Sequence, residues 1–322
     1  MRVSRLTAAF GALAFAAVAA SAQGLPKLAD KPSYKVGFAQ TESNNPWRIA
    51  ETQSLKDAAA TCKWDLVYAD AAGSAAKQVA DVESMIAQKV DVIVLAPREE
   101  KPLIPAVMKA KKAGIPVILI DRNVDQKVAA AGRDYVTFIG SDFIDQGRRA
   151  AEWLVKTTNG KGTVVELEGT TGSSPANDRK KGFDDVVKKQ PGMKIVASQS
   201  GDFARDKGRQ VMQTLLQAHP DVTAVYAHND EMAIGAIAAL EAAGKKPGQD
   251  VMVVSIDGTR DALQAIAAGK MGATVQSSPF FGPVTCATLK RYAKGEKIEG
   301  WVKVSDKFYD KSNAQASMAD GY

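Results

Sequence analysis

The strongest constraint on this chain is a repeated alternation of short apolar segments with helical segments. Val92–Leu95 and Val117–Ile120 contain no polar residue at all. A strand that is apolar along its whole length is typical of a parallel sheet with helices on both faces. Short strands that alternate with helices predict βαβ units, in which the strands lie parallel. The chain is therefore predicted to have an α/β fold built from doubly wound parallel sheets.

The alternation runs through two successive series of similar length. The first has predicted strands at 34–39, 65–69, 90–96, 116–120 and 135–139, and helices at 47–61, 75–88 and 103–113. The second has strands at 163–167, 194–197, 223–227 and 251–256, and helices at 177–189, 206–218, 231–243 and 260–268. Two series predict two similar lobes. A final segment, with strands at 273–275 and 301–304 around a helix at 282–293, is expected to cross back to the first lobe.

The N-terminus has the composition of an export signal. Arg2 and Arg5 precede an almost purely apolar stretch at 6–18, and Ala20-Ser21-Ala22 forms a small-residue cleavage pattern. This order predicts a secretory signal peptide over residues 1–22. The alternative is a single anchoring helix, for which the apolar stretch is short.

Charge and cysteine content exclude several function classes. The net charge is +6, and loss of Arg2 and Arg5 with the signal peptide would leave +4. Basic and acidic residues are interspersed, whereas nucleic-acid binding needs a clustered basic face. Cys62 and Cys286 can pair in an exported protein, but the sequence leaves open whether they meet. Neither belongs to a C-x-x-C pair or lies beside a histidine, so we expect no metal site and no cofactor.

Polar side chains follow several predicted strands at the point where each strand ends. Asp121 and Arg122 follow one strand of the first series, and Asn229 and Asp257 follow two strands of the second. Ligands of parallel α/β sheets bind beyond the carboxyl ends of the strands. Two lobes that face each other along these edges would place the polar groups across one cleft. An aspartate at a strand end can also be a helix N-cap, so the pattern alone leaves that alternative open.

The motifs of common enzyme classes are absent from the sequence. There is no G-x-S-x-G, no phosphate-binding loop ending in Lys-Ser or Lys-Thr, and no G-x-G-x-x-G. The glycine-rich stretch at 169–174 is interpreted as a loop between the lobes. We therefore predict a binding protein and no catalytic residues, with a secreted sugar-acting enzyme as the alternative from another class.

Five motifs in the same order resemble the type I periplasmic binding proteins for sugars, specifically the ribose- and galactofuranose-binding group. They are Val117-Ile118-Leu119-Ile120-Asp121-Arg122, Asp178-Arg179-Lys180-Lys181-Gly182-Phe183, Ser198-Gln199-Ser200-Gly201-Asp202-Phe203, Tyr226-Ala227-His228-Asn229-Asp230-Glu231-Met232 and Ser255-Ile256-Asp257-Gly258. Residues 47–52 and 198–203 look most like a galactofuranose-binding member. Residues 43–46 look more like the ribose-binding pattern.

The resemblance implies a fold, a site and a partner. It implies two lobes, an N-terminal lobe of residues 33–140 plus 278–305 and a C-terminal lobe of 141–277 plus 306–322, joined by a three-strand hinge. It implies that a monosaccharide is bound by Asn45, Trp47, Arg48, Asp121, Arg122, Arg179, Phe203, Asn229 and Asp257. Carboxylates, Asn and Arg can hydrogen-bond the hydroxyls of a sugar, and aromatic rings can cover its apolar faces.

The function implied is capture of a monosaccharide in the periplasm and delivery to the membrane permease of an ABC importer by hinge closure. A galactofuranose-like furanose is the first expectation. Ribose, another pentose or a furanose-like signal molecule is the alternative ligand. We expect a monomer that binds no nucleic acid.

Overall fold

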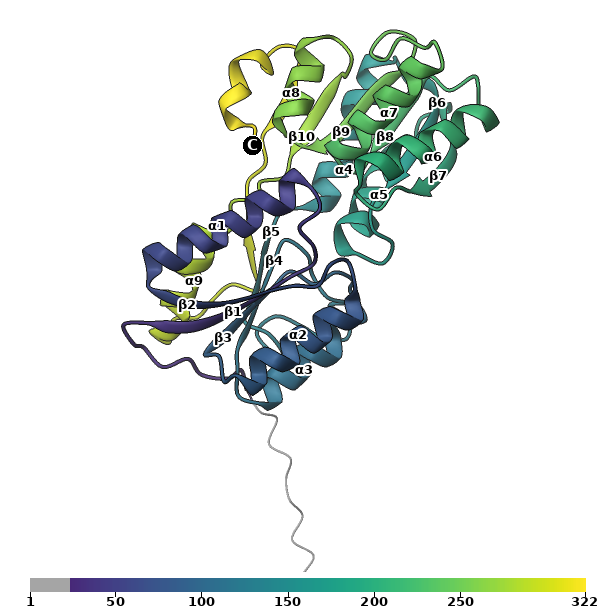
Figure 1. Cartoon of the computed structure of the whole chain (residues 1–322). Helices are drawn as coiled ribbons and strands as arrows, with labels where there is room; N and C mark the ends of the chain where they lie inside the picture. Colours follow the sequence, from purple (N-terminus) through teal and green to yellow (C-terminus); the bar gives the residue numbers. More distant parts are fainter. Residues whose placement is uncertain (1–23) are drawn as a thin grey trace, which may run out of the picture.

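The computed structural model describes residues 24–322, and the predicted signal peptide at 1–22 lies outside them. Two sheets, each with six strands, organise the described part of the chain (Figure 1). The first sheet has the order β11 (Trp301–Lys303), β5 (Thr137–Gly140), β4 (Val117–Ile120), β3 (Val92–Leu95), β1 (Tyr34–Gln40) and β2 (Trp64–Asp70). The second has the order β12 (Phe308–Asp310), β10 (Ala273–Gln276), β9 (Met252–Asp257), β8 (Ala224–Ala227), β6 (Lys161–Glu168) and β7 (Gly192–Ser200).

Helices cover both faces of each sheet, as the fully apolar strands predict. The first lobe, by which we mean the first sheet with its helices, contains α1 (Pro46–Cys62), α2 (Ala75–Ala87), α3 (Ile104–Lys112) and α9 (Gly282–Ala293). The second lobe contains α4 (Phe143–Thr157), α5 (Ser174–Val187), α6 (Arg205–Ala218), α7 (Asp230–Ala242), α8 (Arg260–Ala267) and a 3-10 helix, η1 (Gln315–Asp320).

Strand β3 shows how one short segment contributes to two cores. Val92 and Val94 belong to the core under α1 and α9, together with Leu55 and Leu289. Ile93 and Leu95 belong to the core on the opposite face, under α2 and α3. Successive side chains of a strand point to opposite faces. A strand covered on both sides must therefore be apolar at every position, which is the pattern in the sequence.

Three segments of the described chain pass between the lobes. They connect β5 to α4, β10 to α9, and β11 to β12. All strand pairs in both sheets are parallel except that of β10 with β12, which is antiparallel. The expected lobe bounds leave the strand at 273–275 in the C-terminal lobe, so the predicted crossing lies after this strand. That strand is β10, which pairs with β9, so the chain crosses only after it.

The sequence analysis missed or shortened some elements. It placed no helix between 139 and 163, where α4 lies, although Asp142 caps this helix by accepting a hydrogen bond from the Asp145 backbone N–H. It began α5 at 177, whereas the helix begins at Ser174. Pro175 lies in the first turn, where proline costs no helical hydrogen bond. It assigned no strand to the short edge strand β12, whose three residues carry little periodic signal.

The two cysteines form a disulfide bond, because α1 and α9 pack against each other. Cys62, at the end of α1, is bonded to Cys286 in α9, with 6.4 Å between their Cα atoms. The bond joins residues that are 224 positions apart, so only the tertiary structure could bring them together. Within residues 24–322, no helix is both long and apolar enough to span a bilayer.

Candidate ligand site

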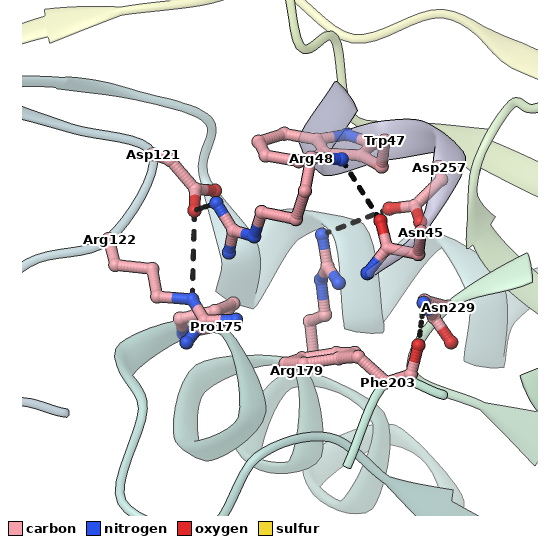
Figure 2. A pocket seen from close by; sticks show the side chains of 10 residues that line it. All are labelled: Asn45, Trp47, Arg48, Asp121, Arg122, Pro175, Arg179, Phe203, Asn229 and Asp257. Carbon is pink, nitrogen blue, oxygen red and sulfur yellow. Dashed lines mark hydrogen bonds and ion pairs between the residues drawn. The ribbon is translucent and has the colours of Figure 1, made fainter. Parts of the chain in front are cut away.

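The two lobes face each other across a cavity at the carboxyl ends of their strands. Its volume is about 340 Å³ when the solvent at its mouth is counted. Ten residues line it: Asn45, Trp47, Arg48, Asp121, Arg122, Pro175, Arg179, Phe203, Asn229 and Asp257. Nine of these are the predicted site residues, and Pro175 is the one that the sequence analysis missed (Figure 2).

Helix starts hold the two asparagines. Asn45 is the N-cap of α1, where its side-chain oxygen accepts a hydrogen bond from the Arg48 backbone N–H at 2.9 Å. Asn229 caps α7 in the same way, with the Met232 N–H as donor at 3.0 Å. The Asn229 amide also donates to the Phe203 carbonyl at 3.1 Å. Each asparagine therefore faces the cavity in an orientation that the helix backbone enforces.

The two aspartates leave their strands in unusual backbone conformations. Asp121 follows β4 with a φ of 57°, and Asp257 ends β9 with a φ of 136°. Residues other than glycine rarely have positive φ, and such positions concentrate at functional sites. Neither aspartate is the N-cap of the helix that follows its strand, so the alternative of a plain capping role does not apply.

Asp121 lies among arginines at the first-lobe side of the cavity. Its Oδ2 is 2.7 Å from Arg48 Nη1 and 3.6 Å from Arg122 Nε. Arg122 also donates from Nη1 to the Arg98 carbonyl at 2.9 Å. Burial, followed by the nearby Arg48 charge, lowers the pKa of Arg122 to about 9. Both arginines keep guanidinium N–H groups that have no protein partner among the described residues, and these can donate to a ligand.

Arg179 and Asp257 form the second-lobe counterpart. Arg179 donates from Nε to Gln146 at 2.9 Å and from Nη1 to the His228 carbonyl at 2.7 Å. Its Nη2 lies 3.7 Å from the Asp257 carboxylate. Burial raises the pKa of Asp257 well above its ordinary value, and Arg179 only partly offsets this effect. A buried carboxylate with one loose ion pair is still available to accept hydroxyl donors.

Two aromatic rings enclose the polar groups from opposite sides, as Figure 2 shows. Trp47 is held by a hydrogen bond from Nε1 to the Ser277 carbonyl at 2.7 Å, and its ring contacts Phe281 edge-on. Phe203 stands on a loop with a φ of 58°. The Phe203 ring packs directly against Gly169. A Cβ atom at position 169 would lie 1.9 Å from the ring, so this position requires glycine. The result is a flat slot with aromatic walls and a hydrogen-bonding rim.

The residues behind the cavity wall include two that the sequence analysis did not propose. Gln40 ends β1, and Glu51 lies one turn after Arg48 on α1; both side chains are fully buried. The spacing of Glu51 from Arg48 is the signal that could have revealed it, because residues three apart on a helix are neighbours. His228 lies behind the wall and contacts Glu166 at 2.9 Å. No group of three or more potential metal-binding side chains occurs within residues 24–322.

Comparison with known proteins identifies the family. Residues 36–297 match the periplasmic binding protein domain family. The chain belongs to this family. This periplasmic binding protein is 41% identical in sequence to the galactofuranose-binding protein YtfQ of Escherichia coli (strain K12). The alignment covers 86% of this chain and 87% of YtfQ.

Two solved structures extend the comparison. A Mycobacterium smegmatis protein in complex with β-D-fucofuranose is 43% identical, with a TM-score of 0.85 over 89% of this binding protein and 94% of that chain. The periplasmic binding component of an arabinose ABC transporter from Shewanella sp. ANA-3, bound to α- and β-L-arabinofuranose, is 38% identical. Its TM-score is 0.83 over 89% of this chain and 95% of that chain. YtfQ and the Shewanella protein are named as binding proteins. Together with the family match, they confirm the predicted fold class and family and the prediction that the chain is not an enzyme.

Proposed function

We propose that this periplasmic binding protein captures a monosaccharide in its furanose form, with galactofuranose as the first candidate, and delivers it to the permease of an ABC importer. The observation that supports the proposal best is the slot between Trp47 and Phe203. Two carboxylates and three arginines line it together with two asparagines. Hydroxyl groups need both donors and acceptors around them, and the C–H faces of a sugar ring suit the aromatic walls.

The choice of a furanose rests on the relatives. YtfQ is named for galactofuranose, and the two structural relatives hold fucofuranose and arabinofuranose. Galactofuranose differs from a pentofuranose by carrying a longer exocyclic chain. In this proposal Arg48, held beside the Trp47 ring at 4.7 Å, donates to that exocyclic part. Replacing Arg48 with alanine should then weaken galactofuranose binding more than arabinofuranose binding, whereas an equal loss would exclude this role.

Each lobe supplies about half of the site, so the ligand can bridge the halves only when the lobes are closed. We assign the lobes to residues 33–140 plus 278–305 and 141–277 plus 306–322, with hinge points near 140–141, 277–278 and 305–306. Because the ligand has its higher affinity for the closed form, binding would shift the population toward closure. The protein would act as a monomer in the periplasm after removal of residues 1–22, without nucleic acid as a partner.

The test is calorimetry of the mature protein against D-galactose, D-fucose, L-arabinose and D-ribose. We expect saturable binding of at least one of the first three sugars, tighter than that of D-ribose. The ring form is then read from the ¹³C resonance of bound [1-¹³C]-D-galactose, which differs between furanose and pyranose. A bound pyranose would overturn the furanose assignment. Continuous heat from turnover, in place of saturable binding, would favour a sugar-acting enzyme.

A further inference from the structure

Glu51 is a buried carboxylate that touches the site without lining it. Its side chain is 0% exposed, and it does not belong to the ten residues of the cavity wall. Its Oε2 accepts hydrogen bonds from Arg48 Nη1 at 2.8 Å and from Gln40 Nε2 at 2.9 Å. The other oxygen, Oε1, is buried with no hydrogen-bond partner among the described residues. An ionised carboxylate in such surroundings is costly and needs a compensating role.

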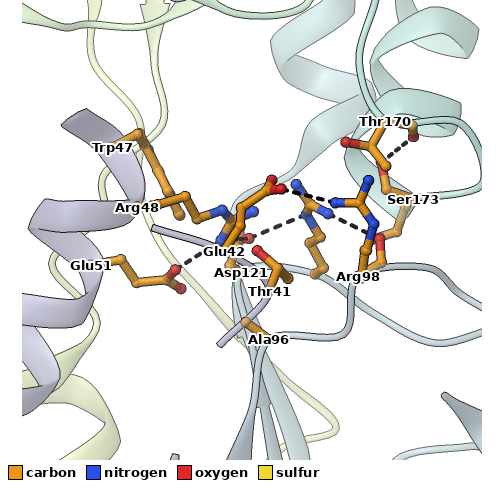
Figure 3. Close-up of polar contacts among 12 residues, drawn as sticks. Thr41, Glu42, Trp47, Arg48, Glu51, Ala96, Arg98, Asp121, Thr170 and Ser173 are labelled. Carbon is orange, nitrogen blue, oxygen red and sulfur yellow. Dashed lines mark hydrogen bonds and ion pairs between the residues drawn. The ribbon is translucent and has the colours of Figure 1, made fainter. Parts of the chain in front are cut away.

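The same guanidinium nitrogen of Arg48 faces two carboxylates. Nη1 lies 2.8 Å from Glu51, behind the wall, and 2.7 Å from Asp121, which lines the cavity (Figure 3). Arg48 is only 4% exposed, and its guanidinium lies over the Trp47 ring. Its orientation is therefore set by one carboxylate from its own helix, one from the loop after β4, and one aromatic face.

Gln40 fixes Glu51 from the neighbouring strand. Its amide donates both to Glu51 and, at 3.1 Å, to the Thr52 hydroxyl, while its carbonyl accepts from the Thr41 N–H at 2.8 Å. The amide orientation is thus determined by three partners. The chain from Gln40 through Glu51 and Arg48 to Asp121 lies entirely within the first lobe, so it does not depend on whether the lobes are closed.

We propose that Glu51 is a positioning residue for the sugar site, which holds Arg48 in place and shares its charge with Asp121. Because Glu51 takes part of the Arg48 interaction, Asp121 keeps more of its capacity to accept sugar hydroxyls. This inference rests on the proposed function, and it adds a residue to the site that the cavity wall does not reveal.

Because Glu51 is buried beside Arg48, we expect the site to be sensitive to pH near neutrality. Burial raises the pKa of Glu51 to about 7; Arg48 and the Gln40 hydrogen bond oppose this rise, and the Asp121 charge adds to it. Two charged groups face Glu51: Arg48 on its own helix and Asp121 from the loop after β4. Glu42, from the loop after β1, contributes a negative charge that raises the pKa of Arg48. Protonation of Glu51 leaves Arg48 to pair with Asp121 alone. Sugar affinity should therefore fall as the pH drops through about 7.

The first arm of the experiment needs no sugar. The fluorescence of Trp47, whose ring contacts the Arg48 guanidinium, is followed from pH 5.5 to 8.5 in the mature protein, with a Trp47→Phe variant used to isolate its signal. We expect a transition near pH 7 in the native protein and none in Glu51→Gln. The native titration, with Trp47→Phe as its reference, decides even if Glu51→Gln does not fold, because the absence of any Trp47 transition would overturn the proposal.

The second arm measures the affinity for D-galactose and L-arabinose by calorimetry across the same pH range. Glu51→Gln keeps one acceptor oxygen but not the charge, and it should weaken binding on the order of 5-fold at pH 8 and flatten the pH profile. Asp257 also has a raised pKa, but it is unchanged in the variant, so the difference between the two profiles belongs to Glu51. Asp57→Asn, an exposed carboxylate on the same helix, is the matched control.

The two arms separate failure of this inference from failure of the proposed function. If no sugar binds at any pH, the proposed function is wrong, while the Trp47 titration still tests the role of Glu51. If sugar binds and Glu51→Gln has the affinity and pH profile of the native protein, Glu51 is a structural residue only. A loss of affinity that is equal at every pH would likewise overturn the charge-sharing role.

Discussion

At the scale of single residues, the site depends on charged groups that are held in place before any ligand arrives. Arg122 is 1% exposed and contacts Asp121 as well as the Arg98 carbonyl. Asp257 is held near Arg179 at the end of β9. Fixed donors and acceptors of this kind lose little freedom on binding, which is how a small cavity can hold a small ligand tightly.

Removal of Arg122 should be among the most damaging changes to sugar binding. A charge-assisted pair of hydrogen bonds in a buried cleft contributes about 2–4 kcal/mol after compensation, so Arg122→Ala should weaken affinity roughly 30- to 1,000-fold. Calorimetry measures the loss, and circular dichroism checks that the fold persists. Lys127→Ala, an exposed change on the same loop, is the control. Unchanged affinity in Arg122→Ala would remove this residue from the site.

At the scale of elements, each lobe contains a cross-link between elements that lie apart in the sequence. In the second lobe, Glu166 on β6 is fully buried and is contacted by His228, Lys180 and Ser198. Burial alone would raise its pKa, but the His228 hydrogen bond and charge, with Lys180 and Ser198, lower it to about 2. In the first lobe, the Cys62–Cys286 bond ties α1, which carries Trp47 and Arg48, to α9.

The Glu166 cluster predicts a stability loss in acid. Its folded pKa of about 2 lies below the ordinary value of 4.5, so the folded state binds fewer protons than the unfolded state between these pH values. The stabilisation is therefore complete above pH 4.5 and is lost as the pH falls toward 2. Denaturant unfolding from pH 3 to 7 should show that Glu166→Gln is less stable than the native protein at pH 7 and that the difference shrinks toward pH 3. A constant difference would contradict this interpretation.

The disulfide should act on stability and hardly at all on affinity. Replacement of both Cys62 and Cys286 by serine should lower the free energy of unfolding by about 2–4 kcal/mol, because the open chain gains conformational freedom. Thermal unfolding measures the change, and sugar calorimetry should return nearly the native affinity. A large loss of affinity without a loss of stability would mean that the bond shapes the cavity through α1.

At the scale of the whole molecule, contacts between the lobes accompany the shared site. Arg98 is bound to Glu42 of its own lobe at 3.0 Å and reaches Asp202 of the second lobe at 3.4 Å (Figure 3 labels the first pair). Asn177 donates to Glu100 across the same gap at 2.8 Å. The two contacts between the lobes end on the partly exposed Asp202 and Glu100, so each contributes little. The bound sugar, with partners on both lobes, would have to supply most of the preference for the closed form.

Closure should be visible by small-angle scattering. Saturation with the best-binding sugar should lower the radius of gyration relative to the sugar-free protein, because the ligand bridges the two lobes. Arg122→Ala at the same sugar concentration is the control, since it should require far more sugar for the same change. If the radius of gyration is unchanged at saturation, the lobes do not close on the ligand and the proposed delivery mechanism fails.

The sequence by itself determined the class of fold, the two series of strands and helices, and the nine polar and aromatic residues that line the cavity. The fold and the strand-end residues could be predicted because their signals are local, whereas Asn45, Trp47, Arg48, Arg179 and Phe203 were predicted from the resemblance to the family. Apolar runs such as Val92–Leu95 report burial on both faces, and residues at the ends of parallel strands, such as Asp121 and Asp257, must gather at one edge. That these nine residues bind a sugar stays a prediction.

The tertiary structure alone decided the features that depend on distant partners. Cys62 meets Cys286 only because α1 and α9 pack on the same face of the first sheet. The spacing of Glu51 from Arg48 makes the two residues neighbours on α1, but Glu51 is buried at the site only because β1 and the loop after β4 bring Gln40 and Asp121 to its helix. Packing, which no local pattern encodes, makes the difference between a solvated carboxylate and a buried one.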